Sequence, residues 1–165
     1  MLHLEVLDKS QHDRNAFYCD NAHLTQYLKE NAKQDVINGV TQVYVLVNKQ
    51  DPLPKKILGY FTLNAFLITT NELPPSSKKS KIKYPTSPAI LIGRLAKDFN
   101  QKEVSGSEIL YAALCKAKSI SKELGAAYAV VHAIDQRAAH FYVNNGFEKI
   151  PSTHSTFVLP LSSIK

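Results

Sequence analysis

The feature that most constrains this chain is a strand–turn–helix pattern in its middle, LIGRLAKDFNQKEVSGSEIL at residues 91–110. The apolar run before the turn is typical of a central strand, and Ile109, Ala113 and Ala117 recur at helical spacing after it. A helix that begins just after a strand presents free N–H groups and the positive end of its dipole at the junction. The pattern therefore predicts an anion site at residues 101–107, although many such units in α/β proteins hold no phosphate.

The segments around this unit predict an α/β domain of the α+β type. Strands are expected at residues 2–7, 40–49, 57–69, 89–99, 126–133, 147–150 and 156–161. Helices are expected from a cap at Asn21 to Gly39, over residues 105–124, and from a cap at Asp135 to about residue 145. The expected sheet is mixed, with an antiparallel N-terminal half, a parallel strand–helix–strand unit and helices on both faces. No repeat or linker interrupts the pattern, so residues 1–165 are expected to form a single domain.

Composition excludes several classes of protein. The chain is 44% hydrophobic and 21% charged, which is ordinary for a folded globular domain. It has no apolar run near the ~20 residues that cross a bilayer and no signal-peptide core, so we expect a cytoplasmic protein without a membrane partner. Cys19 and Cys115 are too few for a disulfide framework, and Cys115 is expected in the core. His, Cys and acidic residues show no metal-ligand spacing, so no metal is expected.

The net charge of +6 is unevenly distributed. Between Asn71 and Lys102 the sequence contains seven cationic residues and two anionic ones. The cations are Lys78, Lys79, Lys81, Lys83, Arg94, Lys97 and Lys102. Such a cluster favours a polyanion, and a solvated basic loop explains it equally well. Tyr84 is the one aromatic residue between Lys78 and Arg94, so the pattern indicates contact with a nucleic-acid backbone rather than base reading.

Two short motifs connect the central unit to a known family. The first, Q-x-x-V-x-G, places Gln101, Val104 and Gly106 in the turn, and the second, D-x-x-A-x-x-F-Y followed by G-F, covers Asp135, Ala138, Phe141, Tyr142, Gly146 and Phe147. Their separation, with one strand between them, resembles the GNAT superfamily of N-acetyltransferases, which use acetyl-coenzyme A as the acetyl donor. The resemblance implies a GNAT fold for the whole chain.

Longer patterns resemble one branch of that superfamily. The segments FYCDNAHLTQYLKENAKQDVINGVTQVYVLV and ILIGRLAKD look like the toxin acetyltransferases of bacterial toxin–antitoxin pairs. This resemblance implies an enzyme that acetylates the amino group of aminoacyl-tRNA and so blocks translation. It also implies a ribbon-helix-helix antitoxin as partner, and it leaves open a homodimer.

The resemblance implies a role for each site residue. The backbone N–H of Leu95 would stabilise charge on the acetyl carbonyl, and Leu95, Ala96 and Lys97 would hold the pantetheine arm. Tyr142 would be the general acid for the departing sulfur. The remaining cofactor contacts would be Gln101, Lys102, Glu103, Val104, Ser105, Gly106, Ser107 and Asp135, the last also a plain helix cap. The tRNA contacts would be Lys78, Lys79, Lys81, Lys83 and Arg94.

Val104 departs from the family pattern, which has glycine at this position. A β-branched residue resists positive φ at a cost of about 1–2 kcal/mol. Two outcomes are open: the loop is strained and binds coenzyme A poorly, or it adopts negative φ and Lys102 adds a phosphate contact.

The fourth expected strand carries no glutamate that could serve as a general base. An α-amino group titrates near ~7.7–8 and a lysine near ~10.4, so the first needs less help to lose its proton. This favours an aminoacyl amine as substrate. Two alternatives remain: acetylation of protein N-termini or small amines, and a non-catalytic RNA- or antitoxin-binding module with a degenerate coenzyme A loop.

Overall fold

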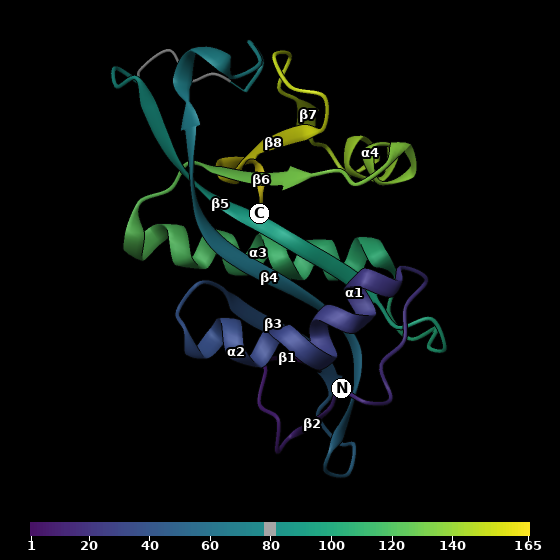
Figure 1. Ribbon diagram of the computed structural model, residues 1–165. Helices are drawn as coiled ribbons and strands as arrows, with labels where there is room; N and C mark the ends of the chain where they lie inside the picture. Colours follow the sequence, from purple (N-terminus) through teal and green to yellow (C-terminus); the bar gives the residue numbers. More distant parts are fainter. Residues whose placement is uncertain (78–81) are drawn as a thin grey trace. The chain divides into compact units, whose positions relative to one another are not determined.

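The computed structural model describes residues 1–77 and 82–165. Its strands are β1 (Leu2–Val6), β2 (His12–Asp13), β3 (Gln42–Asn48), β4 (Lys55–Thr69), β5 (Thr86–Lys97), β6 (Tyr128–His132), β7 (Glu148–Lys149) and β8 (Thr156–Pro160). Its helices are α1 (Ala22–Gln26), the π-helical turn η1 (Tyr27–Asn31), α2 (Ala32–Ile37), the 3-10 turn η2 (Thr70–Glu72), α3 (Gly106–Leu124), α4 (Gln136–Asn144) and the 3-10 turn η3 (Leu161–Ser163). The hydrogen-bonded strand order is β1-β3-β4-β5-β6-β8-β7, with β2 beside β4 (Figure 1).

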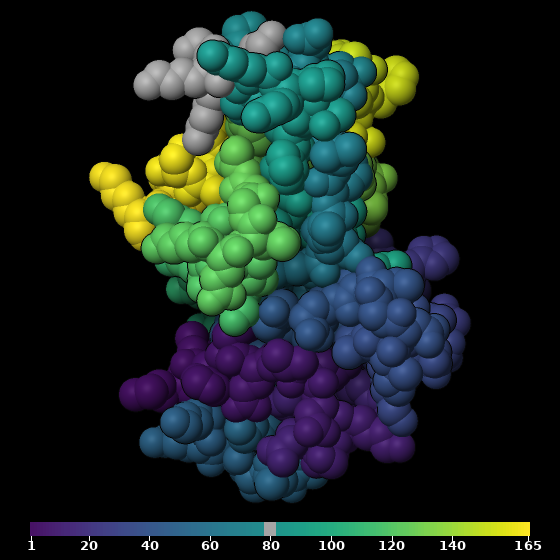
Figure 2. All heavy atoms as spheres, turned by 90° about the vertical axis from the view of Figure 1, so that its left-hand side faces the viewer, coloured from purple at the N-terminus to yellow at the C-terminus, as the bar shows by residue number. Residues whose placement is uncertain are grey.

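The chain divides into two compact units that share β4, β5 and α3. Unit 1 comprises residues 1–64 and 94–113, and unit 2 comprises residues 65–93 and 114–165. In unit 1, β1, β3 and β4 pair antiparallel. The end of β5 joins them, since the N–H of Asp98 donates to the carbonyl of Leu58 at 2.9 Å. In Figure 2 the purple N-terminal residues and the blue residues that follow β3 share one face of this unit.

Alternation along β3 gives unit 1 a core on each face of its sheet. Val43, Val45 and Val47 pack with residues of α1, η1 and α2, while Leu46 belongs to a second cluster with Ile109 of α3. The two clusters follow from the period-2 side-chain pattern of a strand that is buried on both faces. Helices therefore cover both faces, as the sequence predicts (Figure 1).

Gly59 lets α3 approach the sheet closely. A Cβ built at this position would lie 2.4 Å from Cδ1 of Ile109 and 3.0 Å from the carbonyl oxygen of Ala96. Both distances are shorter than a normal van der Waals contact. The first turn of α3, which follows the candidate anion loop, therefore packs on a strand position where an added side chain would force a neighbour to move.

Unit 2 contains the parallel strand–helix–strand part of the fold. Residues Ala89–Ile92 of β5 pair parallel with Tyr128–Val131 of β6. β8 then pairs antiparallel with β6 and β7. Tyr128, Val130 and Val158 are fully buried between these strands, and the Tyr128 hydroxyl donates to the carbonyl of Ser77 at 2.9 Å.

Most of the expected elements are confirmed, with ends shifted by a few residues. Asn21 caps α1 through its side chain. Gly39 and Gly146, each with positive φ, follow α2 and α4 where the sequence places helix ends. β2 and the π-helical turn η1 are additions. Cys115 is only half-buried, so its expected place in the core is wrong. Among the described residues, no helix is long and apolar enough to cross a membrane.

We predict that Gly59→Ala destabilises the protein by about 1–3 kcal/mol, because overpacking forces Ile109 or the sheet to move. Urea unfolding would measure the loss. A Gly59→Ala/Ile109→Val double variant should recover part of it, since Val removes the Cδ1 atom that the new methyl meets. If the two substitutions add without recovery, the contact with Ile109 is not the source of the strain.

Candidate active site in two parts

The buried side chain of Gln101 anchors the candidate anion loop through three hydrogen bonds. Its Nε2 donates to the carbonyl of Leu58 at 3.2 Å and to that of Val104 at 3.0 Å, and its Oε1 accepts from the N–H of Val104 at 2.9 Å. The side chain is buried. Gln101 therefore shapes the loop, and its amide is not directed outward to a ligand.

Val104 is part of the core rather than a strained loop residue. It is 1% exposed and packs with Leu46, Leu58 and Ile109. No non-glycine residue in residues 1–77 and 82–165 has positive φ. Of the two outcomes left open by the sequence, the loop has the negative-φ geometry, and the valine costs no backbone strain.

The N-terminus of α3 is closed by a reciprocal cap. The N–H of Ser105 donates to Oε2 of Glu108 at 2.8 Å, and the N–H of Glu108 donates to Oγ of Ser105 at 3.2 Å. The S-x-x-E pattern of residues 105–108 is typical of such a capping box, and this cap was not predicted in the sequence analysis above. The cap leaves the N–H groups of Gly106 and Ser107, at the first helical positions, without an acceptor within the helix.

The end of β5 has one edge that its sheet neighbours do not use. The parallel ladder with β6 ends at the pair Ile92–Val131. On the other side, the N–H of Asp98 and the carbonyl of Ala96 both point toward β4. Backbone groups alternate along a strand, so the N–H groups of Leu95 and Lys97 point away from β4. Ala96 has a buried side chain, which leaves it no route to a ligand on that edge.

These features fit the pyrophosphate and pantetheine parts of coenzyme A. A long helix offers two free N–H groups at its start, and the exposed side chain of Lys102 lies in the loop before it. The edge of β5 offers two further N–H groups in the manner of an unpaired strand. Glu103 is also exposed in the loop, and its charge opposes an anion there.

Arg94 is occupied within unit 1. Its guanidinium carbon lies 3.6 Å from the ring centroid of Tyr27, which is a cation–π contact. The hydroxyl of Tyr27 donates to Oδ2 of Asp35 at 2.8 Å. Burial and then this hydrogen bond raise the pKa of Tyr27 to about 12. If Arg94 also contacted tRNA, its guanidinium would have to do so while stacked on Tyr27 of η1.

The basic cluster can be placed only in part. Lys78, Lys79 and Lys81 lie outside the described residues. Lys83 is described and exposed, and Lys97 and Lys102 are exposed as well. These exposed lysines are accessible to a polyanion, and the predicted contact stays a prediction.

Tyr142 of α4 is the candidate proton donor of unit 2. It is 8% exposed and makes edge contacts with Phe141 and Phe147, at centroid distances of 5.4 and 5.6 Å. Burial raises the pKa of Tyr142 to about 12, so the phenol remains protonated at neutral pH. A protonated hydroxyl in an aromatic setting can donate a proton or a hydrogen bond to a leaving group.

Asp135 and His132 have structural contacts. Oδ1 of Asp135 accepts from the N–H of Ala138 at 2.8 Å, which confirms the predicted helix cap. His132 is exposed, and its Nδ1 lies 3.1 Å from Oγ1 of Thr156. In the described residues, no group of three His, Cys, Asp or Glu side chains could hold a metal ion.

The architecture, the loop before α3 and the tyrosine of α4 define a GNAT fold. No family model matches the chain. Its sequence is 22% identical to the probable toxin TacT of Sinorhizobium fredii (strain NBRC 101917 / NGR234), over 98% of this chain and 92% of that protein. The expected resemblance to the GNAT toxin acetyltransferases is therefore confirmed.

Solved structures carry the comparison further. AtaT complexed with acetyl-methionyl-tRNAfMet matches with a TM-score of 0.88 and 26% identity, over 99% of this chain and 97% of that one. A tyrosine-to-phenylalanine mutant of KacT matches with a TM-score of 0.87 and 27% identity, over 99% and 96%. AtaTR bound with AcCoA matches with a TM-score of 0.81 and 28% identity, over 99% and 95%. At 23% identity, an AtaT mutant bound to the C-terminus of the antitoxin AtaR shares the fold.

We predict that Val104→Gly lowers the free energy of unfolding by about 2–4 kcal/mol, because it removes a buried side chain and adds backbone freedom. Restoring the glycine of the family pattern should therefore not improve the loop. Urea unfolding would measure the change, with Lys102→Gly as the exposed control in the same loop. Equal stability of the Val104→Gly variant and the parent would show that the core does not depend on this side chain.

Proposed function

We propose that this protein transfers the acetyl group of acetyl-coenzyme A to the amino group of aminoacyl-tRNA and acts in the cytoplasm as a translation-blocking toxin. The observation that carries the proposal is the match, over nearly the whole chain, to AtaT in complex with acetyl-methionyl-tRNAfMet. The match to AtaTR with AcCoA supports the donor. A ribbon-helix-helix antitoxin is the proposed partner, and a second copy of the chain is a further one.

The cofactor would be held by backbone groups of unit 1. The N–H groups of Gly106 and Ser107, with Lys102, would bind the pyrophosphate, and those of Leu95 and Lys97 would bind the pantetheine arm. When bound, acetyl-coenzyme A supplies the thioester that the amine attacks. The N–H of Leu95 would donate to the carbonyl oxygen as it gains negative charge, a contribution of about 3 kcal/mol for such donors.

Tyr142 would donate to the sulfur as the carbon–sulfur bond breaks and the new carbon–nitrogen bond forms. Burial raises the pKa of this phenol to about 12, which supports hydrogen-bond donation to the sulfur rather than complete transfer of the proton. No carboxylate lies on β5 to take the proton of the amine. An aminoacyl ester amine needs no such base, because its pKa lies below that of an ordinary α-amino group near ~7.7–8.

The structure affects the two alternative functions differently. The non-catalytic module depended on a strained Val104, and no strain exists there. Acetylation of protein N-termini or small amines needs the same chemistry, and it differs from the proposal only in the acceptor. The acceptor is therefore what an experiment must identify.

We expect label from acetyl-coenzyme A to move to charged tRNA, and we expect Tyr142→Phe to reduce the rate about 10²-fold or more. The variant keeps the ring that packs on Phe141 and Phe147, so binding of acetyl-coenzyme A should stay within about twofold of the parent. Thin-layer analysis of nuclease-digested tRNA would locate the label. Label on peptides or polyamines, with charged tRNA untouched, would contradict the tRNA substrate and leave the acetyltransferase intact.

The pH dependence of turnover should reflect the amine and not Tyr142. A folded pKa of about 12 means that Tyr142 loses its proton only above about pH 10, so it adds no alkaline fall in kcat below that value. Its raised pKa also contributes to folding stability below about pH 10, and this contribution is lost as the pH approaches 12. A kcat–pH profile of the parent would show the plateau. A fall centred near pH 8 that is absent in Tyr142→Phe would contradict it.

A further inference from the structure

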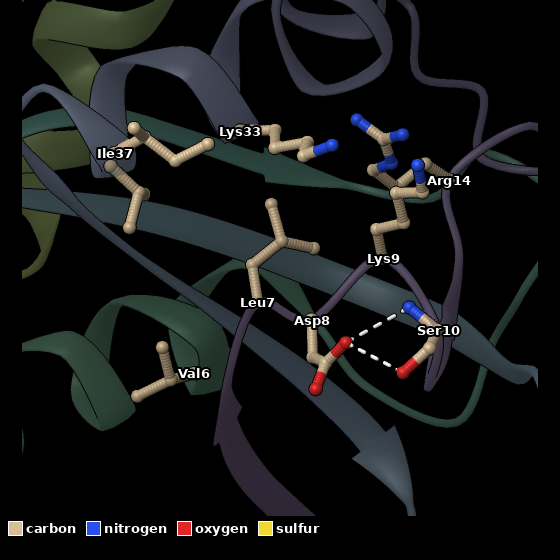
Figure 3. Close-up of a pocket in the computed structure, with 9 residues that line it drawn as sticks. Val6, Leu7, Asp8, Lys9, Ser10, Arg14, Lys33 and Ile37 are labelled. Carbon is tan, nitrogen blue, oxygen red and sulfur yellow. Dashed lines mark hydrogen bonds between the residues drawn. The ribbon is translucent and has the colours of Figure 1, made fainter.

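A second candidate site lies in unit 1, outside the loop and the strand edge described above. It is a pocket of about 460 Å3 beside α2 and the segment that follows β1. Leu7, Val36 and Ile37 form its apolar wall, and Lys9, Arg14 and Lys33 form its cationic wall (Figure 3). Leu7 and Val36 pack against the core of the unit, and Ile37 is 64% exposed at the rim.

The three cations converge on one side of this pocket. Figure 3 shows the ends of Lys9, Arg14 and Lys33 directed toward one another. The pKa of Lys33 is lowered, mainly because the Lys9 amine lies within hydrogen-bonding reach and then because of its charge, and Arg14 adds to the repulsion. Three like charges at one side of the pocket repel one another, although solvent screens the exposed lysines, and a bound anion would relieve this repulsion.

In the part of the chain that the structure describes, no carboxylate forms an ion pair with these three cations. Asp8 lines the same pocket and remains charged, because hydrogen bonds from the N–H and Oγ of Ser10 to its Oδ1, at 2.9 and 2.8 Å, lower its pKa. It offsets part of the positive charge without forming an ion pair with the three cations. Asp35 of α2 does not line the pocket, and its carboxylate accepts from Tyr27. Arg14 donates to the carbonyl of Lys29 at 3.2 Å. Within residues 1–77 and 82–165, Lys9, Arg14 and Lys33 make no ion pair.

The apolar wall decides which anion fits. A nucleic-acid backbone would satisfy the cations, but it has no aliphatic group for Leu7, Val36 and Ile37, and the pocket has no aromatic ring on which a base could stack. An acidic peptide with an aliphatic neighbour satisfies both walls. The volume suffices for a few side chains, as in peptide grooves that combine an apolar anchor with a charged rim.

We propose that this pocket binds a protein segment in which Asp or Glu stands beside Leu, Ile, Val or Met. Its carboxylates meet Lys9, Arg14 and Lys33, and its aliphatic side chain lies on Leu7, Val36 and Ile37. The site is distinct from the cofactor loop and needs neither acetyl-coenzyme A nor tRNA. Its test therefore stands independently of the proposed acetyl transfer.

The test is selection from a library of random linear dodecapeptides on the intact protein, without cofactor or RNA. The strongest binders are then measured by fluorescence anisotropy. We expect enrichment of acidic residues next to aliphatic ones. A Lys9→Gln/Lys33→Gln variant should bind these peptides about tenfold more weakly, the sum of two exposed charge pairs. Ile37→Ser should weaken binding about fivefold, because the rim of the apolar wall is lost.

The matched control is Lys49→Gln/Lys122→Gln, which removes two exposed lysines outside the pocket and the same net charge. Its affinity should stay within about twofold of the parent, and urea unfolding should show that all variants are folded. Absence of acidic–aliphatic enrichment overturns the proposal, and so does equal weakening by the control pair. Loss of tRNA binding in the Lys9→Gln/Lys33→Gln variant, with peptide affinity unchanged, would instead assign the cations to a phosphate backbone.

Discussion

The buried amide of Gln101 is the interaction on which the candidate cofactor site depends. One side chain links a carbonyl of β4 to both backbone groups of Val104. The N–H and carbonyl of Val104 would otherwise be buried without a partner, at a cost of about 1–3 kcal/mol apiece, whereas the carbonyl of Leu58 also accepts from the N–H of Asp98. The amide therefore fixes where the loop turns, and the side chain of Val104 enters the core at that point. The start of α3 follows two residues later, and its Ile109 packs on Gly59, so these contacts fix the positions of the free N–H groups of Gly106 and Ser107.

Periodic and local signals made much of the fold predictable from the sequence. The caps at Asn21 and Asp135 and the glycines after α2 and α4 depend on neighbouring residues, and they are confirmed. The role of Val104 was not predictable, because its partners Leu46 and Leu58 are distant in sequence. Arg94 was assigned by its charge to a basic surface, whereas its stacking on Tyr27 depends on a π-helical turn that no sequence pattern announces. The cluster of Lys9, Arg14 and Lys33 likewise joins an N-terminal segment to a helix, and neither part is strongly basic alone.

The proposed site residues fall into two groups, those that act through the backbone and those that act through a side chain. Leu95, Lys97, Gly106 and Ser107 are proposed to act through backbone N–H groups, so their side chains are not tightly constrained by the chemistry. Tyr142 is the residue for which the side chain itself carries the proposed role. A sequence motif detects the second kind of residue far better than the first. At position 104 valine stands where the family pattern has glycine, and the loop adopts negative φ there without backbone strain. What the loop requires is negative φ, a buried anchor and the amide of Gln101.

The pKa of Tyr142 also limits what a proton donor at this position does. A thiol has a reference pKa near ~8.5, about 3.5 units below that of Tyr142, so complete transfer from the phenol to a free thiolate is uphill by about 5 kcal/mol. Hydrogen-bond donation to the sulfur while the carbon–sulfur bond breaks carries no such cost. With acetyl-coenzyme A bound, the proton that neutralises the thiolate would come more readily from the attacking amine, whose acidity would rise as it becomes an amide. Under the proposed function, the absence of a carboxylate on β5 and the high pKa of Tyr142 would have one explanation: the substrate amine would bring its own proton, and Tyr142 would stabilise the leaving group by a hydrogen bond without giving up its hydrogen.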